Sequence, residues 1–205
     1  MNEFDLKAKD WDKNPMHMER SVAIANGIKK TIPLQHTWRA MEFGTGTALL
    51  SFLLKDYFSE ILLIDTSAEM IKATKEKIAA SSASNMKTML FDLEKNELKD
   101  EKFDIIYTQM VLHHVTDIEL ITGRFLQMLN PGGYLAIADL YPEDGTFHDE
   151  NFKGHKGIDA EKLSATIVHQ GFTEISHSTC YTIKRLNENN TIKEYPVFLL
   201  TAKRK

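Results

Sequence analysis

This 205-residue chain has almost no cysteine and no long apolar run. Its single cysteine, Cys180, excludes an internal disulfide and a zinc site built from cysteines, which suits a reducing compartment. The longest apolar stretches, such as Ala48–Leu54 and Ile61–Ile64, are far shorter than the roughly 20 residues that a membrane-spanning helix needs. The first residues also lack the basic stretch and apolar core of a secretory signal. We therefore expect a cytoplasmic protein with no membrane span.

An excess of positive charge is missing as well. The formal net charge is −4, and acidic and basic residues are interspersed except for a basic cluster at the last three positions, 203–205. Because proteins that bind long nucleic acids need a basic face with many Lys or Arg contacts, we predict no nucleic-acid partner. The contents of 42% apolar and 26% charged residues are typical of a globular protein, and the length suits one domain.

Strand-like and helix-like segments alternate along the chain, which predicts an α/β fold with a mostly parallel sheet flanked by helices. We predict strands over 38–43, 60–64, 86–91, 103–107, 134–140, 172–184 and 195–203. We predict helices over 16–31 and 48–57, from 66 or 67 to about 80, from 116 or 117 to 129, and from 159 to 171. The turn-forming residues 187–190 predict an antiparallel hairpin between the last two strands. Residues 141–157 are polar and have no clear period, which predicts a long loop of the kind that often has a function.

A glycine-containing turn separates the first predicted strand from the helix after it. Residues 42–48 read Glu-Phe-Gly-Thr-Gly-Thr-Ala, and the glycines let the backbone approach a ligand closely. The unpaired N–H groups of the helix N-terminus can bind a carboxylate or a phosphate. A Gly-x-Gly pattern alone is weak evidence, because a plain strand-to-helix turn also explains it.

Two aspartates follow the next two predicted strands. Asp65 lies about 20 residues after the glycine turn, the spacing at which an acidic residue accepts the hydroxyl groups of a ribose. Asp92 follows the third strand, where a carboxylate can accept a hydrogen bond from the amine of a flat base. A helix cap is the alternative role for Asp65, and a surface turn is the alternative for Asp92.

The order of these motifs along the chain resembles that of the class I S-adenosylmethionine-dependent methyltransferases. The set comprises Glu42 to Gly46, Asp65, Asp92, Phe103 to Ile106, Val111 to Val115, and the Leu-Asn-Pro-Gly-Gly break at 129–133. The chain is most similar to the small single-domain group that includes ubiquinone and menaquinone C-methyltransferases, over about Phe4 to Lys203. The resemblance implies a Rossmann-like seven-stranded sheet with an antiparallel C-terminal strand and helices on both faces. It further implies one domain over 1–205, with an N-terminal helical lid over 1–35, a cofactor-binding half over 36–140 and an acceptor side over 141–205.

The resemblance also assigns residues to S-adenosylmethionine. It implies methionine contacts at Gly44, Thr45, Gly46, Thr108 and Gln109, ribose contacts at Asp65, adenine contacts at Thr66, Met70 and Asp92, and further contacts at Glu42 and Leu93. Ala48 stands where many relatives have a third glycine, so the turn is expected to be slightly wider. That missing glycine weakens a rival interpretation, a nicotinamide-dependent oxidoreductase.

Methyl transfer from a sulfonium is an in-line displacement, in which the enzyme holds the two reacting atoms together and excludes water. A general base is needed only when the acceptor loses a proton, so no catalytic residue is assigned. The resemblance places these candidates around the pocket of a small-molecule acceptor: Trp11, Arg20, His113, His114, Asp139, Tyr141, His148 and His155. Trp11 and Arg20, with Met16 and His17, are the candidate lid residues. For each histidine a hydrogen-bonded structural role or a surface position is the favoured alternative, and core packing explains Trp11 and Met16 as readily as a lid does.

Two further alternatives concern metals and catalysis. His148 and His155, with Asp144, Asp149 and Glu150 in the same loop, suggest a metal site, but no tight ligand spacing such as His-x-x-x-His occurs, so we predict no metal. A non-catalytic protein that binds the cofactor as a sensor or partner subunit is the other alternative. The product of the predicted reaction is S-adenosylhomocysteine, and the sequence leaves the acceptor and the oligomeric state open.

Overall fold

The computed structural model describes residues 3–148, 151–186 and 190–205. Seven strands form one sheet in the order β3-β2-β1-β4-β5-β7-β6. The strands are β1 Arg39–Phe43, β2 Glu60–Asp65, β3 Met86–Leu90, β4 Phe103–Gln109, β5 Leu129–Leu140, β6 Phe172–Leu186 and β7 Ile192–Arg204. The α-helices are α1 Glu3–Lys7, α2 Pro15–Thr31, α3 Leu49–Leu54, α4 Ala68–Ser81, α5 Ile118–Met128 and α6 Ala160–Gln170. Short 3-10 turns cover Ala8–Lys13, Lys55–Tyr57 and Leu112–His114.

The predicted sheet is confirmed, including its antiparallel C-terminal part. Strands β1 to β5 pair in parallel, whereas β7 pairs antiparallel with both β5 and β6. The predicted hairpin of β6 and β7 is therefore present, although three of its turn residues, 187–189, lie outside the described residues.

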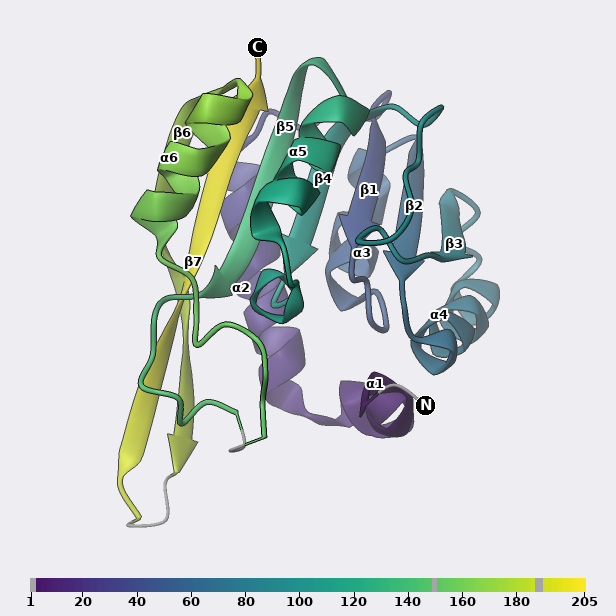
Figure 1. The fold of residues 1–205 in the computed structure, drawn as a ribbon. Coiled ribbons are helices and arrows are strands. Elements are labelled where there is room, and N and C mark those ends of the chain that lie inside the picture. The colour runs from purple at the N-terminus through teal and green to yellow at the C-terminus, as the bar shows by residue number, and fades with distance from the viewer. Residues whose placement is uncertain (1–2, 149–150, 187–189) are drawn as a thin grey trace.

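Helices cover both faces of the sheet, and each strand divides its side chains between two cores. In β4, Tyr107 packs in a core with α2 and α3, whereas Ile106 packs in a second core with α5 and α6. Figure 1 shows α5 and α6 in front of the sheet and α2 behind it. This alternation is the period-2 pattern of strands that are buried on both faces.

The structure selects between the alternative helix caps and moves one strand boundary. Ser67 caps α4 and Asp117 caps α5, because their side-chain oxygens accept hydrogen bonds from the N–H groups of Met70 and Leu120. Strand β5 begins at Leu129, earlier than predicted, because the Asn-Pro-Gly-Gly segment forms an irregular start of the strand opposite β4.

The carboxyl ends of the parallel strands meet at one edge of the sheet. In Figure 1, α1 lies beyond this edge near the ends of β1 and β2, and the β6–β7 hairpin extends past it on the other side. In open parallel sheets this is the edge at which ligands bind. No helix among the described residues has the length and apolar character to cross a membrane.

Candidate functional site

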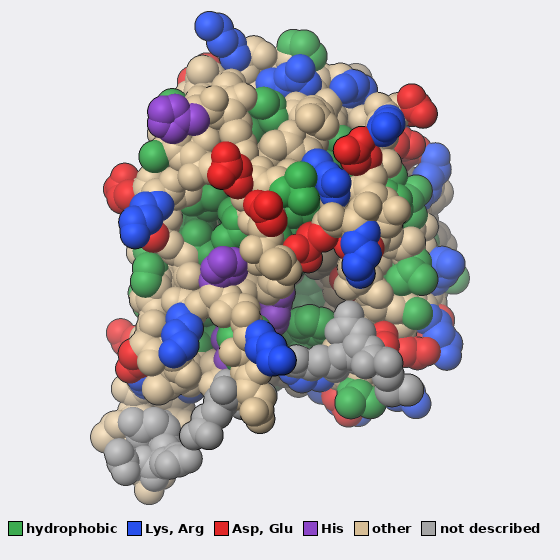
Figure 2. All heavy atoms as spheres, viewed as in Figure 1, with side chains coloured by type: hydrophobic (Ala, Val, Ile, Leu, Met, Phe, Trp, Pro, Cys, Tyr) green, Lys and Arg blue, Asp and Glu red, His purple; other side chains and the backbone are tan. Residues whose placement is uncertain are grey.

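A cavity of about 760 Å³ lies at the carboxyl edge of the parallel strands. Its walls come from the N-terminal segment over 4–20, the carboxyl ends of β1, β2 and β4 with the loops that follow them, the loop after β3, helix α4, residues 147–148 of the loop after β5, and β6. Figure 2 shows histidine side chains around the hollow in the lower half of this face. Its volume falls within the range of small-molecule and cofactor sites.

The glycine turn forms one wall of the cavity and needs its glycines. Gly44 and Gly46 have positive φ values of 66° and 53°. A Cβ atom on Gly44 would lie 2.5 Å from the side chain of Val111, so only glycine fits there. Ala48, which replaces the third glycine of many relatives, also has a positive φ, 62°, and is fully buried. The turn therefore keeps a left-handed backbone at this position even with alanine.

Asp65 links this turn to helix α4. Its Oδ2 accepts a hydrogen bond from the Gly46 N–H at 2.7 Å, and its Oδ1 accepts one from the Ser67 N–H at 2.8 Å. Burial raises the pKa of Asp65, and the backbone N–H groups counteract part of that effect. Each carboxylate oxygen keeps a second lone pair, so the side chain can still accept from a ligand's hydroxyl groups.

The structure brings most of the predicted cofactor residues to the cavity. Those that line it are Gly44, Thr45, Gly46, Asp65, Thr66, Met70 and Gln109. Phe91, an apolar neighbour of Asp92 of the kind expected to hold a flat base, also lines the cavity. The sequence reasoning missed Glu94, which lines the cavity as well. Its position shortly after a strand end was the available signal, but nothing in its residue type singled it out.

Four predicted cofactor residues lie behind the wall or away from it. The carboxylate of Asp92 pairs with Lys95 at 2.7 Å, and this hydrogen bond lowers its pKa. Leu93 instead lines a separate, smaller cavity. The Thr108 hydroxyl donates to the Phe43 carbonyl at 2.9 Å, which ties β4 to β1. Glu42 lies beneath the turn, fully buried.

Glu42 supports the glycine turn from below. Its Oε2 accepts hydrogen bonds from the hydroxyls of Thr45 at 3.0 Å and Ser51 at 2.5 Å. Ser51 also lies 2.7 Å from the buried Tyr107 hydroxyl. Burial raises the pKa of Glu42 to about 7. The carboxyl is therefore close to half protonated at neutral pH.

This carboxyl makes protein stability depend on pH. A carboxyl group with a raised pKa in the folded state stabilises the fold below its unfolded pKa, and this contribution is lost as the pH rises through the folded pKa. With pKa values of 4.5 in the unfolded chain and about 7 in the folded protein, the loss is about 3 kcal/mol between pH 4.5 and 8. We expect Glu42→Gln, which mimics the protonated acid, to match the wild type at pH 5 and to exceed its stability at pH 8.

Urea unfolding of the ligand-free protein at the two pH values measures this difference. Glu60→Gln is the matched control, because Glu60 pairs with Lys87 and Arg39 near the surface and its pKa is lowered. If the stability of Glu42→Gln relative to the wild type is the same at pH 8 as at pH 5, the buried-acid explanation is wrong.

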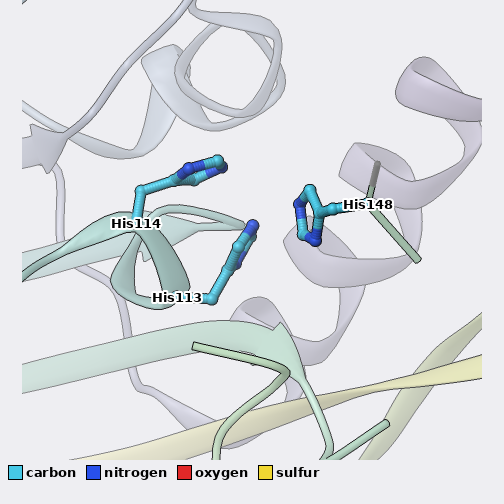
Figure 3. Close-up of side chains that lie close together, drawn as sticks. All are labelled: His113, His114 and His148. Atoms are coloured by element: carbon cyan, nitrogen blue, oxygen red, sulfur yellow. The ribbon is translucent and has the colours of Figure 1, made fainter. Parts of the chain in front are cut away.

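Three histidines meet at the wall of the cavity (Figure 3). Ligand atoms of His113, His114 and His148 all lie within 4.8 Å of one another, although His148 comes from the loop after β5. Each was predicted separately as an acceptor-side residue, and the chain folds so that all three line the cavity. Phe152 stacks on His148 at 3.7 Å between ring centroids and helps to fix it.

His113 is held by a buried carboxylate. Its Nδ1 lies 2.5 Å from Oδ1 of Asp139, and both residues are almost fully buried, with exposures of 1% and 0%. The backbone N–H of His113 also donates to Asp139, at 3.2 Å. A carboxylate that accepts from Nδ1–H leaves Nε2 as the basic nitrogen of a neutral imidazole. Such a pair can move a proton or, with the other two rings, hold a metal ion.

The loop histidine pair considered from the sequence is not brought together. The Nε2 of His155 lies 2.9 Å from the Val115 carbonyl oxygen, and His155 does not line the cavity. Tyr141 is also outside the cavity wall and lies 3.4 Å from His177. Asp144 pairs with Lys193 and Thr146, whereas residues 149 and 150 lie outside the described residues.

The N-terminal segment contributes residues to the cavity wall. Trp11, Met16, His17 and Arg20 all line the cavity. Phe4 of α1 contacts the His114 ring edge-on at 5.1 Å, and Asp12 binds Thr47 at 2.6 Å and Lys77 at 2.8 Å. Two further wall residues, Phe147 and Arg185, belong to segments without any recognisable motif.

The sheet order and a cavity between a glycine turn and an acidic residue define a Rossmann-like nucleoside-binding class of protein. Comparison with known proteins narrows this class. Residues 41–137 match the family described as "Methyltransferase domain". Solved structures share the fold. The YcgJ protein of Bacillus subtilis is 14% identical, with a TM-score of 0.72, and the match covers 89% of this chain and 98% of that one. The N-methyltransferase NodS of Bradyrhizobium japonicum, solved in complex with S-adenosylhomocysteine, is 17% identical, with a TM-score of 0.71, and the match covers 94% of this chain and 89% of that one.

Curated sequences give the same assignment. An uncharacterised methyltransferase of Schizosaccharomyces pombe is 30% identical over 82% of this chain. A ubiquinone biosynthesis O-methyltransferase of Rhodopseudomonas palustris is 26% identical over 66%. The chain spans 59% and 47% of the lengths of these two relatives. These findings confirm the resemblance to the class I S-adenosylmethionine-dependent methyltransferases that was found in the sequence.

Proposed function

We propose that this chain transfers the methyl group of S-adenosylmethionine to a small-molecule acceptor by in-line displacement. The observation that carries the proposal is one cavity lined by two unlike groups of residues. The glycine turn and Asp65 form the first group, and the three histidines and Arg20 form the second. The first group suits a nucleoside with an amino-acid arm, and the polar side chains of the second group suit an acceptor.

The residues at the glycine turn fit the cofactor. The backbone at Gly44 is kept free of a Cβ atom, and Asp65 offers a carboxylate beside it to a ribose diol. Met70 and Phe91 supply apolar contacts of the kind that hold a flat base. When bound there, S-adenosylmethionine supplies a methyl group on a positively charged sulfur. The protein's contribution is to hold the acceptor in line and to exclude water, and the N-terminal residues that line the cavity are the candidates for excluding it.

His113 is the residue placed to take a proton from an acceptor that must lose one. Asp139 fixes its ring and stabilises the imidazolium that forms, which is the task of a carboxylate behind a catalytic histidine. The charge of the site favours this role over a metal role for the three histidines. A divalent ion would be added to the buried Arg20 cation and to the positive charge of the cofactor's sulfur, and like charges repel strongly in a poorly solvated cavity.

Calorimetric titration with S-adenosylhomocysteine tests the proposal directly. We expect binding in the micromolar range and a rise in the unfolding temperature, and we expect neither with NADH, since binding to the folded state alone stabilises a protein. Turnover of a panel of acceptors, followed by S-adenosylhomocysteine release, separates an enzyme from a non-catalytic cofactor sensor. Stabilisation by NADH but not by S-adenosylhomocysteine would favour a nicotinamide-dependent oxidoreductase instead.

A further inference from the structure

Arg20 is a buried cation that faces the cavity. It projects from α2, is only 5% exposed and lines the cavity wall. Among the residues that the structure describes, it forms no ion pair, and its buried Nε has no hydrogen-bond partner. A buried guanidinium without a paired anion is strongly unfavourable, so proteins rarely keep one unless something else neutralises it.

The nearest negative charge does not fill this role. Asp139 attracts Arg20, but its oxygens already accept hydrogen bonds from the His113 ring, the His113 N–H and the Leu140 N–H. Burial lowers the pKa of Arg20 to about 10 despite this attraction. The guanidinium is therefore still charged at neutral pH, and it lacks a direct anionic partner within the described chain.

A second arginine lines the same cavity. Arg185 of β6 packs over the Phe147 ring, with its guanidinium carbon 3.8 Å from the centroid, and its Nη1 donates to the Phe147 carbonyl. Burial is the main cause of the lowered pKa of Arg20, and repulsion by the charge of Arg185 adds to it. An anion near both side chains would convert this repulsion into two attractive contacts.

The position of Arg20 indicates which end of the cavity would hold the anion. Its electrostatic neighbours are Asp139, Tyr181 and Arg185, which belong to β5 and β6. Asp65 lies at the end of β2, on the far side of β1 and β4 in the sheet order. The cavity thus has a carboxylate at the end suited to a ribose and two guanidinium groups at the end occupied by the histidines.

We propose that Arg20 and Arg185 bind an anionic group, a carboxylate or a phosphate, carried by the methyl acceptor. This inference rests on the proposed methyltransferase function and names the chemical class of its acceptor. Guanidinium groups match both anions because their N–H groups form parallel hydrogen bonds with two oxygen atoms. The carboxylate of the cofactor's own amino-acid arm is the other possible source of the anion, and the experiment below separates the two.

The test uses the full chain saturated with S-adenosylhomocysteine and titrated with malonate or with inorganic phosphate at constant ionic strength. We expect at least one of these anions to bind, and the neutral malonamide not to bind. Arg20→Met and Arg185→Met should each weaken anion binding at least about tenfold, as expected for loss of one charge-assisted contact. Arg39 lies at the start of β1, whereas the cavity lies beyond the other end of this strand. Arg39→Met therefore removes the same charge at a distance from the cavity and should leave anion binding unchanged.

A comparison of two nucleosides identifies the source of the anion. S-adenosylhomocysteine has the amino-acid arm, whereas 5′-methylthioadenosine lacks it. If Arg20→Met weakens only S-adenosylhomocysteine, the guanidinium binds the cofactor's carboxylate and our proposal is wrong. It is also wrong if neither anion binds the loaded wild-type protein, or if Arg20→Met binds them equally well. Failure of S-adenosylhomocysteine to bind the wild type would instead refute the proposed function. If Arg20→Met does not fold, Arg185→Met and Arg20→Lys provide the same comparison.

Discussion

Replacing Asp65 with alanine is expected to weaken S-adenosylhomocysteine binding by about a hundredfold or more. A hydrogen bond to a charged group contributes about 1.5 to 3 kcal/mol, and a carboxylate that holds a ribose diol makes two of them. The substitution also removes the acceptor for the Gly46 and Ser67 N–H groups, which lie 2.7 Å and 2.8 Å from the two carboxylate oxygens. The glycine turn and the start of α4 would then lose the group that holds them together. Isothermal calorimetry on the folded variant measures the loss.

Two other substitutions control this experiment. Asp65→Asn keeps the shape and one acceptor oxygen, so we expect an affinity between those of the wild type and the alanine variant. Asp92→Asn changes the same residue type one strand away, where the carboxylate pairs with Lys95 instead of facing the cavity. We expect its affinity to stay within about threefold of the wild type, which is within the effect of a surface ion pair. An Asp65→Ala variant that binds S-adenosylhomocysteine as tightly as the wild type would remove Asp65 from the ribose role.

The fold could be predicted from the sequence because its signals are local. Ser67 and Asp117 cap helices through bonds to residues three positions ahead, and the apolar periods of strands and helices appear within short windows. The boundaries that differed depend on distant partners. Strand β4 extends to Gln109 because its last residues pair with Ile137 and Ala138 of β5. That pairing is set by the tertiary fold, and no local pattern reports it.

The sequence shows which residues follow the strand ends and so border the candidate site. It does not show which of their side chains point into the cavity. Asp65 and Asp92 have the same type and the same kind of position, yet one faces the cavity and the other pairs with Lys95 in its own turn. Arg185 reaches the cavity only because β6 extends past the edge of the sheet beside β7. The meeting of His148 with His113 depends likewise on the path of a long loop. Such contacts join residues far apart in sequence, and spacing rules do not describe them.

Replacing His113 with glutamine is expected to lower kcat by about 10²- to 10⁴-fold for an acceptor that must lose a proton, which is the usual contribution of a general base. The cofactor end of the cavity should be unaffected, so S-adenosylhomocysteine affinity should stay at the wild-type level. Asp139→Asn should also lower kcat, because an amide can no longer hold the His113 ring in the required tautomer or stabilise its protonated form. Single-turnover measurement with saturating acceptor isolates this step from binding.

The same variants distinguish proton transfer from metal binding at the three histidines. If His113 acts as a base, dialysis against a chelator leaves kcat unchanged, and His155→Gln, a substitution outside the cavity wall, behaves like the wild type. If the three rings hold a metal, the chelator abolishes activity, Co²⁺ restores it with a visible absorption band, and His148→Gln removes that band. We expect the first result, because a divalent ion would lie in a cavity that already contains two arginines and must accept a sulfonium. Loss of activity on chelation would assign the three histidines to a metal and show that the charge argument underestimates Asp139.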